Sequence, residues 1–302
     1  MELTVLSYGG GQDSTTLLYK YALDNNFRKK YAPGRLLVIM ADTGDEHPHT
    51  YKHIQFIKEF CSQNVVEFVH LTNDMGFHSP DWQTLRFFYK TKNRIGSKCF
   101  PKTCTERLKL RPIYKYLEYW IQKEYGFKSG RKKGLKQFAE TYDKINMLIG
   151  IAKGEEKRVN KGERPKWQEK AIEVIYPLIE MGMDRKDCQD YMASTGLHVP
   201  YPSNCLLCPF MSEIELLWLY RFYREDYEEW ELLERNKIRA NALEGDPTKS
   251  KNSRGEIVPN MGVWGEKLLP QILEETIKKH GHMSNDELNE YKFNHGCNQS
   301  KY

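Results

Sequence analysis

The first 75 residues alternate between short apolar runs and longer stretches in which apolar residues recur at helical spacing. The apolar runs are "LTVLSY", "RLLVIMAD" and "VVEFVHLT", and the helical stretches between them are "STTLLYKYALDNN" and "TYKHIQFIKEFCSQ". The two later apolar runs are almost continuous, which is typical of strands covered on both faces. The pattern therefore predicts a doubly wound, mostly parallel α/β sheet with right-handed crossovers.

Further elements follow in the next hundred residues. Ser79 and Pro80 are typical of an N-cap and first helical position, and they predict a helix over 79–90. A helix over 105–125 should be interrupted near Pro112. We expect strands at 145–152 and 174–178, and then a helix that Asp184 caps and that ends at Gly196.

The character of the chain changes near residue 200. Residues 201–210 read as a loop, 212–238 as one long aromatic-rich helix, and 244–262 as another loop. The last forty residues resemble one amphipathic helix followed by a polar tail. We therefore expect an α/β domain over 1–200 and a loop with a mainly helical C-terminal region over 201–302.

Composition and charge narrow the class of protein. The chain has 302 residues, of which 39% are hydrophobic and 29% charged, and no apolar run approaches the ~18 to 20 residues needed to cross a bilayer. The N-terminus lacks the features of a signal peptide, so we expect a cytoplasmic protein with no membrane partner. The net charge of +5 permits an anionic partner, and positive charge gathers at 128–136 and 153–166. These segments are either solvated, partly mobile loops or a nucleic-acid contact surface.

The stretch "SYGGGQDSTT" (7–16) is the first candidate for chemistry. It reads as a strand end, a glycine turn and a helix N-terminus, where backbone N–H groups lack partners within the helix. It is neither a Walker A sequence nor a dinucleotide fingerprint. Its hydroxyl groups suit a pyrophosphate or sulfate, whereas Asp13 would repel one unless it caps the helix or holds Mg²⁺. An ordinary glycine-rich turn would also fit the pattern.

This stretch resembles the PP-loop of the adenine nucleotide α-hydrolase superfamily, which includes N-type ATP pyrophosphatases and the phosphoadenosine phosphosulfate (PAPS) reductase family. Four further segments are similar in the same order: "ADTGDEHPHTY", "CTERLKLRPIYKYL", "IGIAKGEEKR", and "YPLIEMGMDRKDCQDYM" followed by "SNCLLCPF". The resemblance covers roughly residues 3–215 and leaves the C-terminal third uncovered.

The resemblance implies roles for individual residues. Binding of an adenine nucleotide would fall to Ser7, Gly9, Gly10, Gly11, Asp13, Ser14, Thr15, Asp42, Thr43 and Gly150. Asp13, Lys109 and Arg158 would be catalytic, with Glu155 or Glu156 also facing the nucleotide. The nucleotide would be ATP with Mg²⁺, or adenosine phosphosulfate (APS) or PAPS as substrate.

Seven cysteines suggest a second site. Cys61 and Cys188 lie within helical patterns and read as packing residues. Cys205 and Cys208 form a Cys-x-x-Cys pair that can share a metal ion or an iron–sulfur cluster.

Reductases that carry a [4Fe–4S] cluster have a Cys-Cys pair ahead of such a motif. Here Cys104 matches its first member, but Thr105 takes the place of the second. The resemblance thus implies Cys104, Cys205 and Cys208 as ligands, and either Cys99 supplies the fourth or the cluster keeps one open iron. Structural Zn²⁺ or thiols without a metal would also suit the motif. Cys297 is a tail residue, an extra ligand or a catalytic thiol.

Three functions remain open from the sequence. The first is an ATP pyrophosphatase or adenylating enzyme that is coupled to sulfur transfer, with a sulfur donor protein, onto an unidentified acceptor such as tRNA, DNA or a small molecule. The second is an APS or PAPS reductase, which uses a thiol to release sulfite. The third is a non-catalytic nucleotide- or nucleic-acid-binding protein that reuses the fold.

Overall fold

A five-stranded parallel sheet forms the centre of the molecule. The computed structural model describes residues 2–128, 130–159 and 162–295. The strands are β1 (Leu3–Ser7), β2 (Arg35–Ala41), β3 (Glu67–Leu71), β4 (Ile145–Ile149) and β5 (Ile172–Ile175). They lie in the order β3-β2-β1-β4-β5, and every neighbouring pair is parallel. The predicted doubly wound parallel α/β fold is confirmed.

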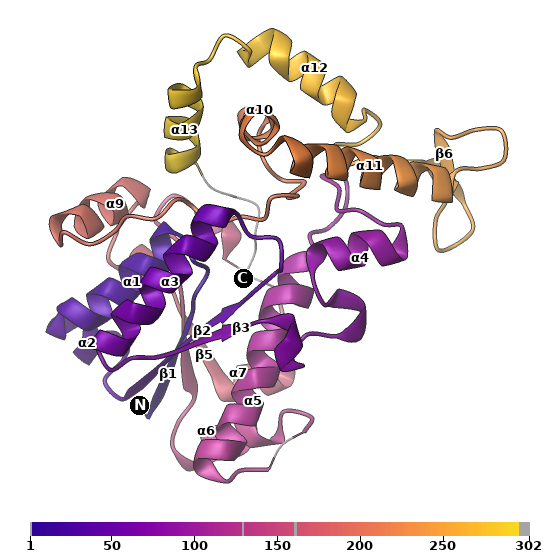
Figure 1. Cartoon of the computed structure of the whole chain (residues 1–302). Helices are drawn as coiled ribbons and strands as arrows, with labels where there is room; N and C mark the ends of the chain where they lie inside the picture. The colour runs from indigo at the N-terminus through magenta and orange to yellow at the C-terminus, as the bar shows by residue number, and fades with distance from the viewer. Residues whose placement is uncertain (1, 129, 160–161, 296–302) are drawn as a thin grey trace.

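Helices cover both faces of this sheet (Figure 1). Alternate residues of β2 supply the two cores: Leu36, Val38 and Met40 face one side, and Leu37, Ile39 and Ala41 face the other. The first side packs against α1 (Gln12–Leu23), α2 (Asn25–Tyr31), α3 (Pro48–Gln63), α8 (Pro177–Glu180) and α9 (Arg185–Ser194). The second packs against α5 (Arg111–Tyr125), α6 (Lys133–Thr141) and α7 (Lys166–Ala171). Cys61 and Cys188 are buried in the first core, which confirms them as packing residues.

The strand order creates a crevice beside β1. The chain builds outward from β1 to β2 and β3, and then returns to place β4 on the other side of β1. The loops after β1 and β4 therefore leave the same sheet edge in different directions. Open parallel sheets bind ligands at such a point, and the glycine loop lies there.

The C-terminal part is mainly helical, as predicted. It contains α10 (Glu213–Phe222), α11 (Arg224–Asn241), α12 (Leu269–His280) and α13 (Asn285–Asn294). Its apolar core surrounds Trp230 and includes Leu85 and Tyr89 of α4 (Leu85–Lys92) and Leu108 of a π-helical segment (Thr105–Leu110). The helices after residue 200 thus pack on residues that precede β4.

Several predicted elements in this part were wrong. The expected single helix over 212–238 is two helices that meet at Tyr223, where the backbone turns away from helical angles (φ −137°, ψ 58°). The expected loop over 244–262 contains an antiparallel hairpin of β6 (Lys249–Lys251) and β7 (Ile257–Pro259). The final segment forms two helices instead of one, because Ser284 and Glu287 begin α13 with a capping box.

Boundaries shifted elsewhere in the chain. Pro80 opens only a short 3₁₀ turn, η2 (Pro80–Trp82), and Thr84 caps α4 in place of Ser79. The basic segment 128–136 was predicted as a loop but runs into α6. The expected strands end early, at Ile149 and Ile175. The remaining 3₁₀ turns are η1 (Asn73–Met75) and η4 (Glu156–Arg158).

Two helix boundaries were predicted correctly. The helix over 105–125 changes from π to α geometry at Arg111, next to Pro112. Asp184 caps α9 through a reciprocal capping box with Asp187. None of the described helices combines the length and the apolar character needed to span a bilayer.

Candidate functional site

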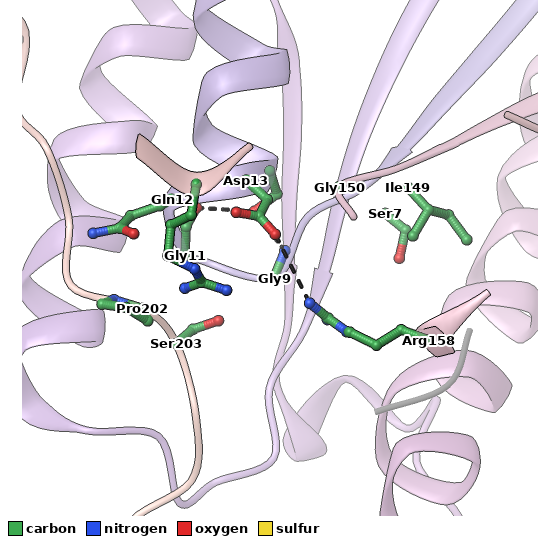
Figure 2. Close-up of a pocket in the computed structure, with 12 residues that line it drawn as sticks. Ser7, Gly9, Gly11, Gln12, Asp13, Ile149, Gly150, Arg158, Pro202 and Ser203 are labelled. Carbon is green, nitrogen blue, oxygen red and sulfur yellow. Dashed lines mark hydrogen bonds and ion pairs between the residues drawn. The ribbon is translucent and has the colours of Figure 1, made fainter. Parts of the chain in front are cut away.

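A cavity lies over the glycine loop (Figure 2). Its wall comes from the loop after β1, the end of β4, the start of α9 and the 202–203 segment. The predicted residues in that wall are Ser7, Gly9, Gly11, Asp13, Ser14, Gly150 and Arg158. The structure thus brings together predicted residues that lie up to 151 positions apart in the sequence, from Ser7 to Arg158.

Glycine is required where chain segments meet at this cavity. A Cβ on Gly150 would lie 2.7 Å from the Ser14 nitrogen, and one on Gly11 would lie 2.8 Å from the Ser203 nitrogen. Neither backbone atom can move aside as a flexible side chain could. The loops after β1 and β4 and the 202–203 segment therefore touch through their backbones, which fixes the shape of the cavity.

The loop leaves the N-terminus of α1 open to a ligand. Gly9 N–H donates to Ser14 Oγ at 3.1 Å, and Ser14 Oγ donates to the Gly11 carbonyl at 3.2 Å. The N-cap residue is Gly11, which has no side chain to cap the helix. Gln12, Asp13 and Ser14 carry the first N–H groups of α1 and line the cavity, and a helix N-terminus beside a cavity favours an anion.

Two arginines and two carboxylates surround this N-terminus. Arg158 Nη1 lies 3.8 Å from Asp13 Oδ2, and both Arg158 and Arg185 form ion pairs with Glu155. The two guanidinium side chains are only 11% and 19% exposed. Burial alone would raise the pKa of Glu155, but Arg185 and Arg158 outweigh it and lower that pKa. Glu155, rather than Glu156, is thus the acidic partner of Arg158.

Asp13 is the unsatisfied group in this cluster. Its Oδ1 atom is buried and has no hydrogen-bond partner among the described residues. Burial raises the pKa of the Asp13 carboxyl, and Arg185 and Arg158 offset that effect only in part while Glu155 adds to it. A buried carboxylate oxygen with no partner marks a position where a proton, a cation or a donor on a ligand would be stabilised.

A second cavity adjoins the first. Arg158 and Ser203 line both cavities. The second one is also lined by Thr43, Lys109 and three cysteines, Cys104, Cys205 and Cys208. Lys109 Nζ lies 3.0 Å from Glu46 Oε1, and Thr43 Oγ1 donates to the same carboxylate at 3.2 Å. Lys109 is therefore held beside the thiols and next to Arg158.

Of the three cysteines in this cavity, Cys208 is buried, and Cys104 and Cys205 are half-buried. Cys205 is held by an antiparallel bridge to Glu46, and its Sγ lies 3.3 Å from Thr43 Oγ1. Burial raises the pKa of the Cys205 thiol well above its usual value, and Glu46 adds to this, whereas Lys109 lowers it. Cys205 is thus a neutral thiol at physiological pH.

The cysteines do not form a metal-ligand set in this structure. Over residues 2–128, 130–159 and 162–295, no group of three or more His, Cys, Asp or Glu side chains is arranged to hold a metal ion. Cys99 is exposed, lies against Gly265 and does not line the cavity of the other three. Cys297 lies outside the described residues. The [4Fe–4S] cluster and Zn²⁺ stay predictions, and no step below depends on them.

Some predicted binding residues instead build the loops. Gly10, with φ +74°, packs against Thr50 and Met40. Thr15 Oγ1 is buried and bonded to Tyr8 Oη at 2.8 Å and to His53 Nε2 at 3.1 Å. Neither residue lines a cavity at the sheet edge, so their hydroxyl and backbone groups fix the loop rather than face a ligand.

Asp42 is another predicted binding residue that fixes a loop. It accepts hydrogen bonds from Gly44 N–H at 2.8 Å and from Tyr51 Oη at 2.9 Å, and His70 Nε2 lies 3.4 Å away. Burial would raise its pKa, but His70 and these hydrogen bonds outweigh burial and lower it. Asp42 therefore fixes the loop after β2.

Five residues of this wall were missed in the sequence: Gln12, Ile149, Arg185, Pro202 and Ser203. Arg185 could have been predicted as a site residue, because it follows the correctly predicted N-cap Asp184 and begins α9. No feature of the sequence indicated Gln12. Its Nε2 donates to the carbonyls of Pro200 at 3.0 Å and Phe293 at 3.1 Å, which ties the glycine loop to the end of α13.

Comparisons with known proteins do not assign this chain to a family. No protein-family model matches the chain, and no curated protein sequence matches it. The resemblance to the PP-loop superfamily therefore rests on the sequence motifs and stays a prediction.

Proposed function

We propose that this chain is an adenine-nucleotide-dependent enzyme that acts at the α-phosphate, as an ATP pyrophosphatase or adenylating enzyme coupled to sulfur transfer. One observation carries the proposal: the open N-terminus of α1 faces Arg158, Arg185 and the unsatisfied Asp13 in one cavity. Helix N–H groups and buried guanidinium groups together favour a polyanion. The cytoplasm suits this activity, because the thiols of the second cavity stay reduced there.

In this proposal one part of the nucleotide lies in each of the two cavities. The pyrophosphate would occupy the glycine loop, so that the α-phosphorus comes to lie near Arg158, the residue that both cavities share. An acceptor oxygen would then form a bond to the α-phosphorus while the bond to the leaving pyrophosphate breaks. Arg158 and Lys109 would stabilise the charge that develops, and each well-aimed donor contributes about 3 to 4 kcal/mol.

Mg²⁺ fits this cavity through Asp13. Protein-bound Mg²⁺ commonly uses one or two carboxylates together with substrate phosphates. The Oδ1 atom of Asp13, which has no hydrogen-bond partner among the described residues, would supply such an oxygen. Mg²⁺ bound there would supply neutralisation of phosphate charge, and Arg158 and Arg185 would add positive charge to the same cavity.

A thiol-dependent APS or PAPS reductase is the second candidate. It is favoured by Cys104, Cys205 and Cys208, which line the cavity that Lys109 and Arg158 also border. In that reaction a thiolate attacks the sulfonyl sulfur and releases the nucleotide phosphate, and a second thiol then releases sulfite and forms a disulfide. The raised pKa of Cys205 counts against this thiol as the attacking group.

Thermal unfolding of anaerobically purified protein tests the proposal without knowledge of the acceptor. ATP with Mg²⁺, APS and PAPS are compared, since a ligand at 100 times its Kd adds about 2.7 kcal/mol to the free energy of unfolding. We expect the largest stabilisation from ATP with Mg²⁺, and we expect Arg158→Met to remove most of it. Arg224→Met, on an exposed arginine of α11, is the control that should leave it intact.

Each other result has a definite meaning. Preference for APS or PAPS would replace the proposal with the reductase, and sulfite release would be measured next. Absence of stabilisation by all three nucleotides would overturn both candidates.

A further inference from the structure

A third cavity lies beyond the thiols. It is formed by the start of α4, the loop over 93–103 and the Pro209–Phe210 turn. Aromatic rings dominate its wall, among them Trp82, Phe88, Phe100 and Phe210. The rings of Trp82 and Phe88 are stacked with centroids 3.7 Å apart, and Phe100 is 55% exposed. Flat apolar faces are therefore available at the surface of the molecule.

The charged residues of this cavity all have the same sign. Arg94, Lys102 and Arg107 line it, and no Asp or Glu does so within the part of the chain that the structure describes. Lys102 Nζ also lies 5.2 Å from the centre of the Phe210 ring. Cations among aromatic rings favour a ligand that is itself flat and aromatic and that carries negative charge.

Neighbouring cavities among the three share residues of their walls. Lys102 and Cys104 line both the aromatic cavity and the thiol cavity. Arg158 and Ser203 connect the thiol cavity to the glycine loop. A molecule bound among the aromatic rings would therefore extend toward the place where we put the α-phosphorus.

Several contacts hold this cavity in position. Leu85 N–H donates to the Thr43 carbonyl at 2.9 Å, which anchors α4 on the loop after β2. Ser97 Oγ donates to the Gly262 carbonyl at 2.8 Å, and Trp264 Nε1 donates to the Pro209 carbonyl at 2.9 Å. The aromatic wall is thus preformed relative to the glycine loop, as a substrate site requires.

We propose that the aromatic cavity binds a nucleobase of a single-stranded nucleic acid, with the flanking phosphates on Arg94 and Arg107. This inference rests on the proposed function, for which it names the class of acceptor. Single strands fit because their bases are free to stack on side chains, whereas paired bases are not. An acidic peptide would satisfy the cations but would leave the aromatic faces unused.

Fluorescence anisotropy of the full chain tests this site. The probes are short labelled oligonucleotides of one sequence as single-stranded RNA, single-stranded DNA and duplex DNA, with an acidic peptide as a fourth probe. We expect a single-stranded probe to bind best, and the RNA and DNA arms identify which sugar the site accepts. Phe100→Ala should weaken that binding on the order of tenfold, because one stacking platform is lost.

Charge variants test the phosphate contacts separately. Arg94→Gln should reduce the slope of log K against log salt concentration by about 0.7, the value for one phosphate contact on a single strand. Tyr119→Ala and Lys123→Gln are the matched controls, because they remove an exposed aromatic residue and an exposed cation from α5. Both controls should leave affinity and slope unchanged.

The outcomes separate this inference from the proposed function. If ATP stabilises the protein but no single strand binds at low salt, the acceptor site is wrong and the proposed function stands. If single strands bind through Phe100 but no nucleotide stabilises the protein, the site stands and the proposed function fails. Equal effects of the site and control variants, or peptide binding as tight as that of oligonucleotides, would overturn the aromatic site.

Discussion

The loops after β1 and β2 leave the same sheet edge, and each carries an aspartate, yet they use it in opposite ways. Asp13 has a buried oxygen without a partner among the described residues and a raised pKa. Asp42 accepts from Gly44 N–H and Tyr51 Oη, lies beside His70, and has a lowered pKa. Position at the edge is thus shared, but the two aspartates differ. Asp13 keeps one carboxylate oxygen without a hydrogen-bond partner among the described residues, whereas Asp42 uses its carboxylate to fix its own backbone.

The second loop also supports the C-terminal helices. Asp45 is fully buried and pairs with Arg86 of α4, which in turn pairs with Asp226 and Glu229 of α11. The Asp45 carbonyl accepts from Leu206 N–H at 2.8 Å. We propose that the first loop receives the nucleotide, and the second connects the two parts of the molecule.

The largest expected effect concerns that connection. Arg86→Met should lower the free energy of unfolding by about 3 kcal/mol, because it leaves the buried Asp45 carboxylate without its cation. Urea unfolding of the two proteins gives the difference. Lys90→Met is the control, since the Lys90 pair with Glu229 is largely exposed and contributes less than about 1 kcal/mol. Equal losses from the two variants would show that the second loop is not a support.

A smaller effect is expected at Asp42. Asp42→Asn should cost about 1 to 3 kcal/mol at neutral pH, because charge-assisted hydrogen bonds are lost. The lowered pKa of Asp42 means that its contribution is present above the ordinary aspartate pKa of about 3.9 and is lost as the pH falls through the folded-state pKa. Unfolding of both proteins between neutral and acidic pH should therefore show two curves that converge in acid. A gap independent of pH would mean that the carboxylate charge plays no part.

The smallest effect on stability is expected at Asp13. Its raised pKa means that ionisation costs the folded protein free energy once the pH rises above about 3.9. Asp13→Asn should therefore leave the protein equally stable or up to about 1 kcal/mol more stable at neutral pH, with a difference that disappears in acid. Stabilisation by ATP with Mg²⁺ should nevertheless fall sharply in the same variant. A marked loss of stability without ligand would make Asp13 a structural residue like Asp42 and end the contrast between the loops.

Much of the fold was predictable because local patterns and the sheet agree. The apolar runs of β1, β2 and β4 and the cap at Asp184 lie where the sequence indicates. The break at Tyr223 was missed, since the apolar spacing continues across it and only packing around Trp230 divides the helix. The short hairpin of β6 and β7 was missed because three-residue strands carry little periodic signal.

The site was predictable only in part, for a related reason. Motif order placed Arg158 and Gly150 at the glycine loop, but it could not separate residues that face the cavity from residues that shape the loop. Thr15 and Ser14 are neighbours in sequence, yet Thr15 bonds internally to Tyr8 and His53 while Ser14 lines the cavity. Ser203 enters the site only because Gly11 lets the two backbones touch. Such contacts depend on tertiary packing, which no single stretch encodes.

The bond from Gln12 to the Phe293 carbonyl bears on when the site is complete during synthesis. A ribosome delivers the glycine loop among the first residues of the chain, but the partner of Gln12 emerges only near the end. The N-terminal sheet is able to fold early, as N-terminal domains generally do. The glycine loop can reach its final shape only after almost the whole chain has been synthesised. A product that ends before α13 would therefore contain the motif but not the complete site.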